Sequence, residues 1–140
     1  MKGKSRAVLT AGLGAVLGLF IAPSAAAVTS LDIGNASLEA KGLVATVPLT
    51  FTCESGGYYE GDIYVRQKVQ QRTFTDGRTF FGGSCTGEPQ TITVQVRAYW
   101  KPFKKGTATA QGFLLCHAWT DTGESYECGS ARVTEEIQLR

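Results

Sequence analysis

The clearest signal in the chain is a period-two alternation of apolar and polar side chains. In residues 43–53 every odd position is apolar, and the even positions are mostly threonine. The same pattern, typical of a strand with one buried face, returns in residues 90–100 and near the C-terminus. We predict about seven strands, near residues 31–39, 43–53, 61–73, 79–85, 90–100, 107–119 and 130–139. Short alternating strands separated by turns indicate an all-β, immunoglobulin-like antiparallel sandwich, with a partly closed barrel as the alternative.

Glycine and proline suggest where these strands end. Asp76-Gly77 predicts a two-residue type I′ hairpin, because both central residues of that turn need positive φ. Pro48 cannot donate to a ladder, so its strand is expected at a sheet edge or with an irregularity there. The segment Tyr99–Gly106, YWKPFKKG, carries three aromatics and three lysines. We interpret it as a surface connection, with Phe103 tucked under the crossover between sheets, rather than as an anion-binding patch.

The N-terminus has the three parts of a secretory signal peptide. Three basic residues precede the uncharged run Ala7–Ala22, and small residues follow up to Ala27. The apolar run is shorter than a membrane-spanning helix needs, so no stable membrane insertion is expected. We predict cleavage near Ala27 and a secreted, extracellular product, residues 28–140, which is the length of one domain.

Removal of residues 1–27 changes the charge balance. That segment holds three basic residues and no acidic one, so the formal net charge falls from +2 to −1. A nearly neutral domain has no overall field to attract nucleic acid, and we expect no such partner. We expect a monomer.

Four cysteines lie in residues 28–140, and an even number in an exported chain predicts two disulfides. Three pairings are possible. We prefer Cys53–Cys85 with Cys116–Cys128, because a meandering sheet brings these sequence neighbours together. Zinc is disfavoured, since there is no C-x-x-C motif and the only histidine is His117. We expect neither a metal nor another cofactor.

The order of these features resembles that of a group of small exported immunoglobulin-like proteins of actinobacteria, mostly uncharacterised. The features concerned are Thr52-Cys53, Gly83–Gln90, Phe103–Ala108, Cys116 and Cys128. The resemblance covers nearly all of residues 28–140, and because its motifs are turns and cysteines it implies a fold and no catalytic residue. The architecture is also similar to that of the enediyne-carrying apoproteins of the neocarzinostatin group, which are exported and held by two disulfides.

Motifs for catalysis are missing. A serine nucleophile needs a histidine base, and His117 stands in the middle of a predicted strand. The thiols are expected to be oxidised, and most carboxylates fall in loops or at strand ends. We therefore expect a protein that is not an enzyme. Catalysis would require His117 within hydrogen-bond reach of a carboxylate and a hydroxyl in a cleft.

Residues 112–119, GFLLCHAW, depart from simple alternation. The even positions suit the core, yet three of the four odd ones, which should face outward, are large and apolar. An exposed apolar stripe rimmed by charge often marks a binding surface. We predict a ligand-binding face from this strand and its neighbour, made of Tyr64, Arg66, Phe113, Leu115, His117 and Trp119. Two other interpretations stay open: the loop Glu54–Glu60 covers this face, or a bulge near Gly112 turns Phe113 inward.

The predicted function is an exported, non-enzymatic binding module for a protein, a glycan or a small hydrophobic molecule. A carrier predicts a concave apolar cleft, and a glycan binder predicts coplanar exposed rings. The alternative is an inhibitor of a secreted hydrolase that acts through the Cys116–Cys128 loop, because a disulfide-closed loop is preorganised. Rigid projection of residues 120–126 would favour the inhibitor.

Overall fold

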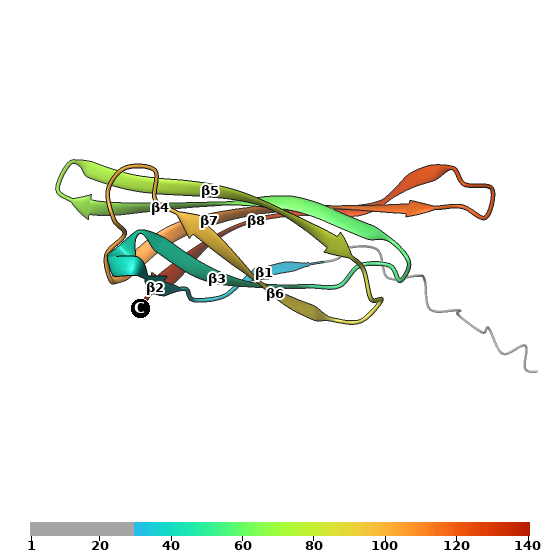
Figure 1. The fold of residues 1–140 in the computed structure, drawn as a ribbon, viewed down its shortest axis with the longest axis horizontal. Helices are drawn as coiled ribbons and strands as arrows, with labels where there is room; N and C mark the ends of the chain where they lie inside the picture. The colour runs from blue at the N-terminus through green and yellow to red at the C-terminus, as the bar shows by residue number, and fades with distance from the viewer. Residues whose placement is uncertain (1–29) are drawn as a thin grey trace, which may run out of the picture.

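A computed structural model describes residues 30–140 (Figure 1), so the predicted signal peptide lies outside the described residues. Nearly all of this part is extended chain. The elements are β1 (Leu31–Ile33), β2 (Ser37–Glu39), the 3₁₀ turn η1 (Ala40–Gly42), β3 (Val44–Phe51), β4 (Tyr58–Gln70), β5 (Thr73–Ser84), β6 (Gln90–Arg97), β7 (Gly106–Trp119) and β8 (Ser125–Leu139). Within residues 30–140 no helix is long and apolar enough to cross a membrane.

The strands form two antiparallel sheets that face each other. In one sheet β3 lies between β6 on one side and the short β1 and β2 on the other. The other sheet has the order β5–β4–β7–β8. This division of strands is that of immunoglobulin-like sandwiches, and it confirms the predicted sandwich. The predicted first strand, 31–39, is in fact two strands, because residues 34–36 interrupt its pairing with β3.

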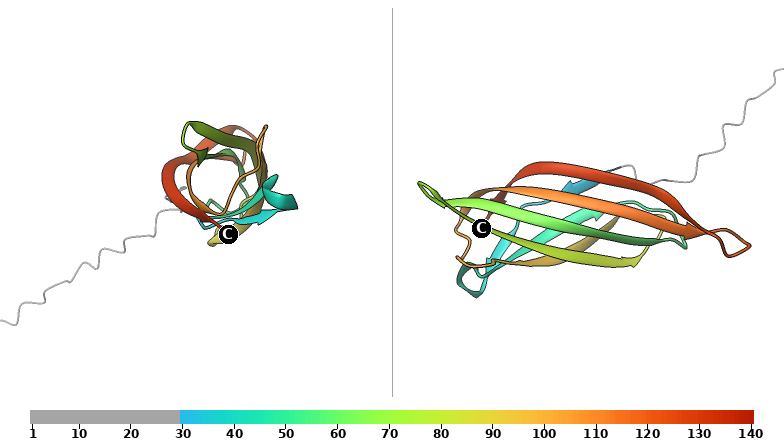
Figure 2. Two further views of the ribbon diagram at one scale, coloured as in Figure 1. Left: turned by 90° about the vertical axis from the view of Figure 1, so that its left-hand side faces the viewer. Right: turned by 90° about the horizontal axis from the view of Figure 1, so that it is seen from above.

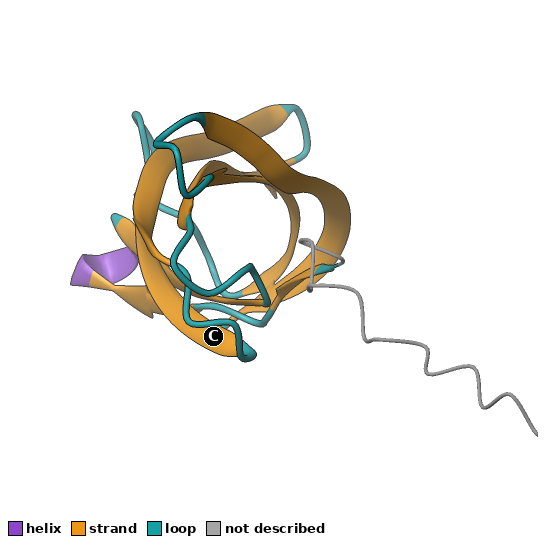
Figure 3. Cartoon of the chain, turned by 90° about the vertical axis from the view of Figure 1, so that its right-hand side faces the viewer, coloured by secondary structure: helices purple, strands orange, loops and turns teal. Residues whose placement is uncertain are grey.

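Seen along its long axis, the domain has a rounded cross-section (Figure 2, left, and Figure 3), because the edges of the two sheets approach each other and form one isolated bridge, between Ala36 and Leu139. The backbone N–H of Ala36 donates to the carbonyl of Gln138 (3.0 Å), and the hydroxyl of Thr79 donates to the carbonyl of Gln95 (2.7 Å). These few bonds do not merge the ladders, so the sandwich stays unclosed and the barrel alternative does not apply.

Both predicted disulfides are present, in the preferred pairing. Cys53–Cys85 joins the end of β3 to the end of β5 and so links the two sheets, with a Cα–Cα distance of 5.4 Å. Cys116–Cys128 joins the neighbouring strands β7 and β8, at 5.0 Å. The sulfurs of Cys53, Cys85 and Cys116 lie within 4.8 Å of one another, so the two disulfides pack side by side in the core.

The predicted hairpin at Asp76-Gly77 is wrong. Both residues lie inside β5, where Gly77 pairs with Val65, and the chain turns instead at residues 71–72. A Cβ at Gly77 would collide with the carbonyl oxygen of Arg97. Gly77 therefore allows β5 and β6 to approach closely, and the turn signal is a by-product of that need.

Of the two expectations for Pro48, the edge position is wrong, because β3 is central in its sheet, and the irregularity is present. Pro48 faces the break between β1 and β2, where its carbonyl accepts from the N–H of Gly34 (2.9 Å). The extent of the strand 90–100 also needs correction. β6 ends at Arg97, so Trp100 does not extend the buried face and is 68% exposed. Phe103 is buried as predicted, at 2% exposed, beneath the β6–β7 connection.

Candidate functional site

All six predicted site residues lie on the outer face of the β5–β4–β7–β8 sheet. Pairing of β4 with β7 sets Tyr64 opposite Gln111 and Asp62 opposite Phe113. Leu115, His117 and Trp119 continue the outward row of β7 toward the β7–β8 turn, and Arg66 continues that of β4 toward the other end. The inward residues of β7, from Ala108 to Ala118, are buried. The alternation that predicted the face is therefore kept along the whole strand.

Neither alternative that would hide this face holds. Residues 54–57 form a turn at the strand end, Tyr58 begins β4, and Tyr59 points into the core at 6% exposed. Alternation runs through Gly112 without a break, and the register shift of β7 and β8 falls later, beside Cys116. Phe113 is half-buried on the outer side, and Trp119 is 54% exposed.

Three arginine–phenylalanine stacks cross the face. The guanidinium carbon lies 4.3 Å from the ring centre for Arg66 over Phe74, and 4.9 Å for Arg78 over Phe80. Arg132 covers the ring of Phe113 at 4.9 Å. Such contacts stabilise by about 0.5–1 kcal/mol at exposed sites, and they hold flexible arginines in fixed positions.

The residues of β5 were missed from the sequence. Its outward positions are two charged residues, Asp76 and Arg78, with a phenylalanine on either side, Phe74 and Phe80. This pattern was available in residues 73–84, but the Asp76-Gly77 turn signal divided the strand in two. Asp62 of β4 was missed as well.

Hydrogen bonds fix the polar groups between the rings. Arg78 donates through Nε to Oδ2 of Asp62 (2.7 Å), and this bond raises the pKa of the guanidinium. The hydroxyl of Tyr64 donates to Oδ2 of Asp76 (2.7 Å). Burial, followed by that bond, raises the pKa of Tyr64, so its phenol stays protonated and remains a donor. Among residues 30–140 Arg132 forms no ion pair, which leaves its N–H groups available.

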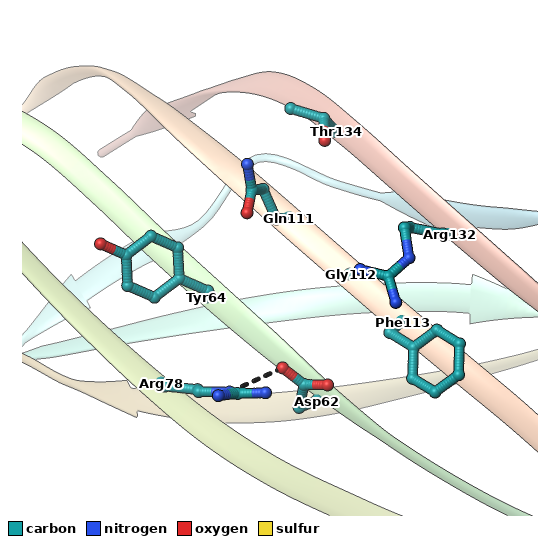
Figure 4. Close-up of a pocket in the computed structure, with 8 residues that line it drawn as sticks. All are labelled: Asp62, Tyr64, Arg78, Gln111, Gly112, Phe113, Arg132 and Thr134. Atoms are coloured by element: carbon teal, nitrogen blue, oxygen red, sulfur yellow. Dashed lines mark hydrogen bonds and ion pairs between the residues drawn. The ribbon is translucent and has the colours of Figure 1, made fainter.

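A shallow depression of about 550 Å³ occupies the centre of the face (Figure 4). It is lined by Asp62, Tyr64, Arg78, Gln111, Gly112, Phe113, Arg132 and Thr134. In Figure 4 the rings of Tyr64 and Phe113 are both seen face-on, and Gln111 lies opposite Tyr64 on the same strand as Phe113. A second depression, of 710 Å³, shares Tyr64 and extends past Arg66, and a third, of 390 Å³, shares Phe113 and extends to Tyr58. The three form one track along the sheet.

His117 fulfils part of the condition for catalysis. Its Nε2 lies 3.1 Å from Oε1 of Glu60, the neighbouring outward residue of β4. Among residues 30–140 no hydroxyl is hydrogen-bonded to His117, and the residue does not line the three depressions. Of the six predicted residues, Tyr64, Arg66 and Phe113 line the track, and Leu115, His117 and Trp119 lie beyond it on the same face.

The β7–β8 hairpin, orange in Figure 1, extends past the rest of the sandwich. Strand pairing continues to Trp119 and Ser125, and Cys116–Cys128 staples the hairpin where it leaves the body. In the turn of this hairpin, the backbone N–H of Thr120 donates to the carbonyl of Glu124 (2.8 Å). The projection of residues 120–126 that would favour the inhibitor is therefore present.

Comparison with known proteins adds no relative. No protein-family model and no curated protein matches the chain. Its function has to be inferred from its own residues and their geometry.

Proposed function

We propose that the chain is an exported, non-enzymatic module that binds a glycan on the outer face of the β5–β4–β7–β8 sheet. The observation that carries this proposal is the uncovered track of depressions, in which aromatic rings lie between fixed polar groups. The actinobacterial resemblance and the two disulfides support export.

The chemistry of the track favours a sugar over an apolar ligand. The C–H faces of a pyranose pack on aromatic rings, and the ring of Tyr64 lines the central depression beside the Arg132–Phe113 stack. Sugar hydroxyls need donors and acceptors in fixed directions, which the Asp62–Arg78 pair and Gln111 supply. Sites for small hydrophobic molecules are enclosed and mostly apolar, whereas this track is open and its central depression is lined chiefly by polar groups.

Affinity electrophoresis tests the proposal. The chain, expressed full-length and purified from the medium, is run through gels that contain neutral or acidic soluble polysaccharides. We expect retardation by at least one class. Arg132→Ala removes a charged donor worth about 1.5–3 kcal/mol, so affinity should fall roughly 10- to 150-fold. Tyr64→Ala should also weaken binding.

Gln95→Ala is the matched control, because Gln95 is an exposed strand residue of the opposite sheet. It should leave retardation unchanged. Equal retardation of the wild type, Arg132→Ala and Tyr64→Ala would place any glycan contact elsewhere. No retardation by any polysaccharide, from a correctly folded chain, would defeat the proposal.

Inhibition of a secreted hydrolase is the second candidate, and the stapled, projecting β7–β8 hairpin favours it. Its turn is exposed and internally hydrogen-bonded, which reduces the entropy lost when an enzyme cleft binds it. Dose-dependent inhibition that is abolished by Thr122→Arg but kept by Arg132→Ala would identify the hairpin. The reverse dependence would assign activity to the sheet face.

A further inference from the structure

The two ends of the sandwich carry opposite charge. At the end where β4 turns into β5, the connections 40–43, 71–72 and 98–105 hold Lys41, Arg72, Lys101, Lys104 and Lys105 and no acidic residue. The connections at the opposite end, 52–57, 85–89 and 120–124, hold Glu54, Glu88, Asp121 and Glu124 and no basic residue. We call the first set of connections the basic tip.

Because the two ends lie far apart, the net charge of the whole domain does not predict how either end interacts with a charged surface. β4 runs between them over 13 residues, which at ~3.3 Å per residue is roughly 40 Å. The Debye length in physiological salt is only about 8 Å. A charged surface that approaches the basic tip therefore does not sense the acidic end, and a domain of net charge −1 can still be attracted to an anion.

The main loop of the basic tip is held rigidly. Only two polar side chains of residues 30–140 are buried, Gln67 and Thr75, and both bind this loop. Gln67 donates to the carbonyl of Lys104 (2.6 Å) and accepts from its N–H (2.8 Å), and Thr75 donates to the carbonyl of Lys101. Phe103 anchors the loop in the core.

The adjoining η1 turn is fixed to the same loop. Phe103 donates through its N–H to the carbonyl of Gly42 (2.8 Å), and Ala98 donates to that of Leu43 (2.9 Å). Gly42 has φ +86, and a Cβ there would collide with the carbonyl of Phe103. Two connections far apart in sequence therefore form one surface.

This rigid surface exposes large apolar side chains among the lysines. Tyr99 is 63% exposed, Trp100 is 68% exposed and Leu43 is 50% exposed. Lys101, Lys104 and Lys105 are exposed as well. Two acidic side chains that flank this surface in the sequence, Glu39 and Asp76, accept hydrogen bonds from Thr46 (2.7 Å) and Tyr64 (2.7 Å), and within residues 30–140 neither forms an ion pair with a lysine of the tip.

We propose that the basic tip docks on an anionic phospholipid bilayer, with Tyr99 and Trp100 at the depth of the headgroups and the lysines against lipid phosphates. Tryptophan and tyrosine favour the membrane interface because they combine an apolar ring with a polar group. Lysines near an anionic surface add attraction. The tip is one end of an elongated domain (Figure 1), and such an end can be set against a flat surface, whereas a linear polyanion is bound along a groove.

Vesicle co-sedimentation tests the docking. The chain purified from the medium is mixed with phosphatidylcholine vesicles with or without phosphatidylglycerol. We expect binding only with phosphatidylglycerol, weakened by salt. Lys101→Gln/Lys104→Gln/Lys105→Gln should lower the partition coefficient on the order of a hundredfold, at about fivefold per lysine. The loop is held through its backbone, so this variant should unfold at the wild-type temperature.

The control carries the same net charge change at the other end. Ser55→Glu/Thr122→Glu/Ser125→Glu adds three negative charges to exposed positions near the acidic loops. It should bind vesicles as the wild type does. An equal loss in both variants would mean that net charge alone governs binding, and the basic tip would have no special role.

Tryptophan fluorescence shows which end meets the lipid. The chain has two tryptophans, so Trp119→Phe leaves Trp100 as the only reporter, and Trp100→Phe leaves Trp119. We expect a blue shift on anionic vesicles from Trp100 alone. Equal binding to neutral vesicles, no vesicle binding, a shift from Trp119 alone, or capture by a soluble acidic polysaccharide without lipid binding would each overturn the proposal.

Discussion

Replacing Gln67 by leucine tests how the loop of the basic tip is held. Leucine has a similar size and suits a site that is 4% exposed, but it cannot bind the backbone of Lys104. Both the N–H and the carbonyl of Lys104 would lose their partner. Each orphaned group costs about 1–3 kcal/mol. Because the side chain of Lys104 is exposed and water can reach part of the site, we expect a total loss of about 2–5 kcal/mol.

Urea denaturation measures this loss as a lower midpoint with an unchanged slope. Amide exchange at Lys104 should also become faster, because its N–H is no longer bonded. Gln95→Leu is the control, since Gln95 is exposed in the middle of β6 and its substitution should change stability by less than about 0.5 kcal/mol. If Gln67→Leu is as stable as this control, the two hydrogen bonds do not hold the loop and the rigidity of the basic tip is refuted.

Two other properties follow from the fold. Removing the inter-sheet disulfide with Cys53→Ala/Cys85→Ala should lower the free energy of unfolding by about 4 kcal/mol, and removing the hairpin disulfide should lower it by about 3 kcal/mol, because the first disulfide closes the longer loop. The reverse order in urea denaturation would contradict this. Burial and then the bond to Asp76 raise the pKa of Tyr64 above the usual phenol value, near 10. The contribution of that bond to stability is therefore present below the usual value and is lost as pH rises through the raised one. The stability difference between the wild type and Tyr64→Phe should therefore narrow in alkali, and a constant difference would show that the bond contributes nothing.

Side-chain periodicity was enough to predict the fold and the sheet face on which the candidate site lies, with three of the residues that line it. A strand buried on one side has to alternate, so β3 and β7 were visible in the sequence, and the outward row from Phe113 to Trp119 followed from them. The disulfide pairing followed from the same meander, because consecutive strands bring Cys53 near Cys85 and Cys116 near Cys128.

The main error in the sequence prediction arose where a contact between the two sheets determines which residue a position requires. Asp76-Gly77 has the sequence of a tight turn, yet Gly77 is required by the approach of Arg97 from the other sheet. Rules that use only neighbouring residues in the sequence cannot predict that contact. The error also hid Phe74 and Arg78, so the first half of the edge strand β5 was missing from the sequence prediction. Trp100 was assigned inward because alternation gives no sign of where β6 stops.

The two proposed surfaces do not compete for the same part of the molecule. The track runs along the length of the four-stranded sheet, whereas the basic tip is confined to the connections at one end. A domain docked by that end would stand on the membrane with its track facing sideways and its acidic hairpin pointing away, since like charges on lipid and hairpin repel. Glycan binding and lipid binding should therefore be independent of each other. Arg132→Ala should leave vesicle binding intact, and the lysine variant should keep its affinity for the glycan. Loss of both activities in either variant would place the two ligands on one surface.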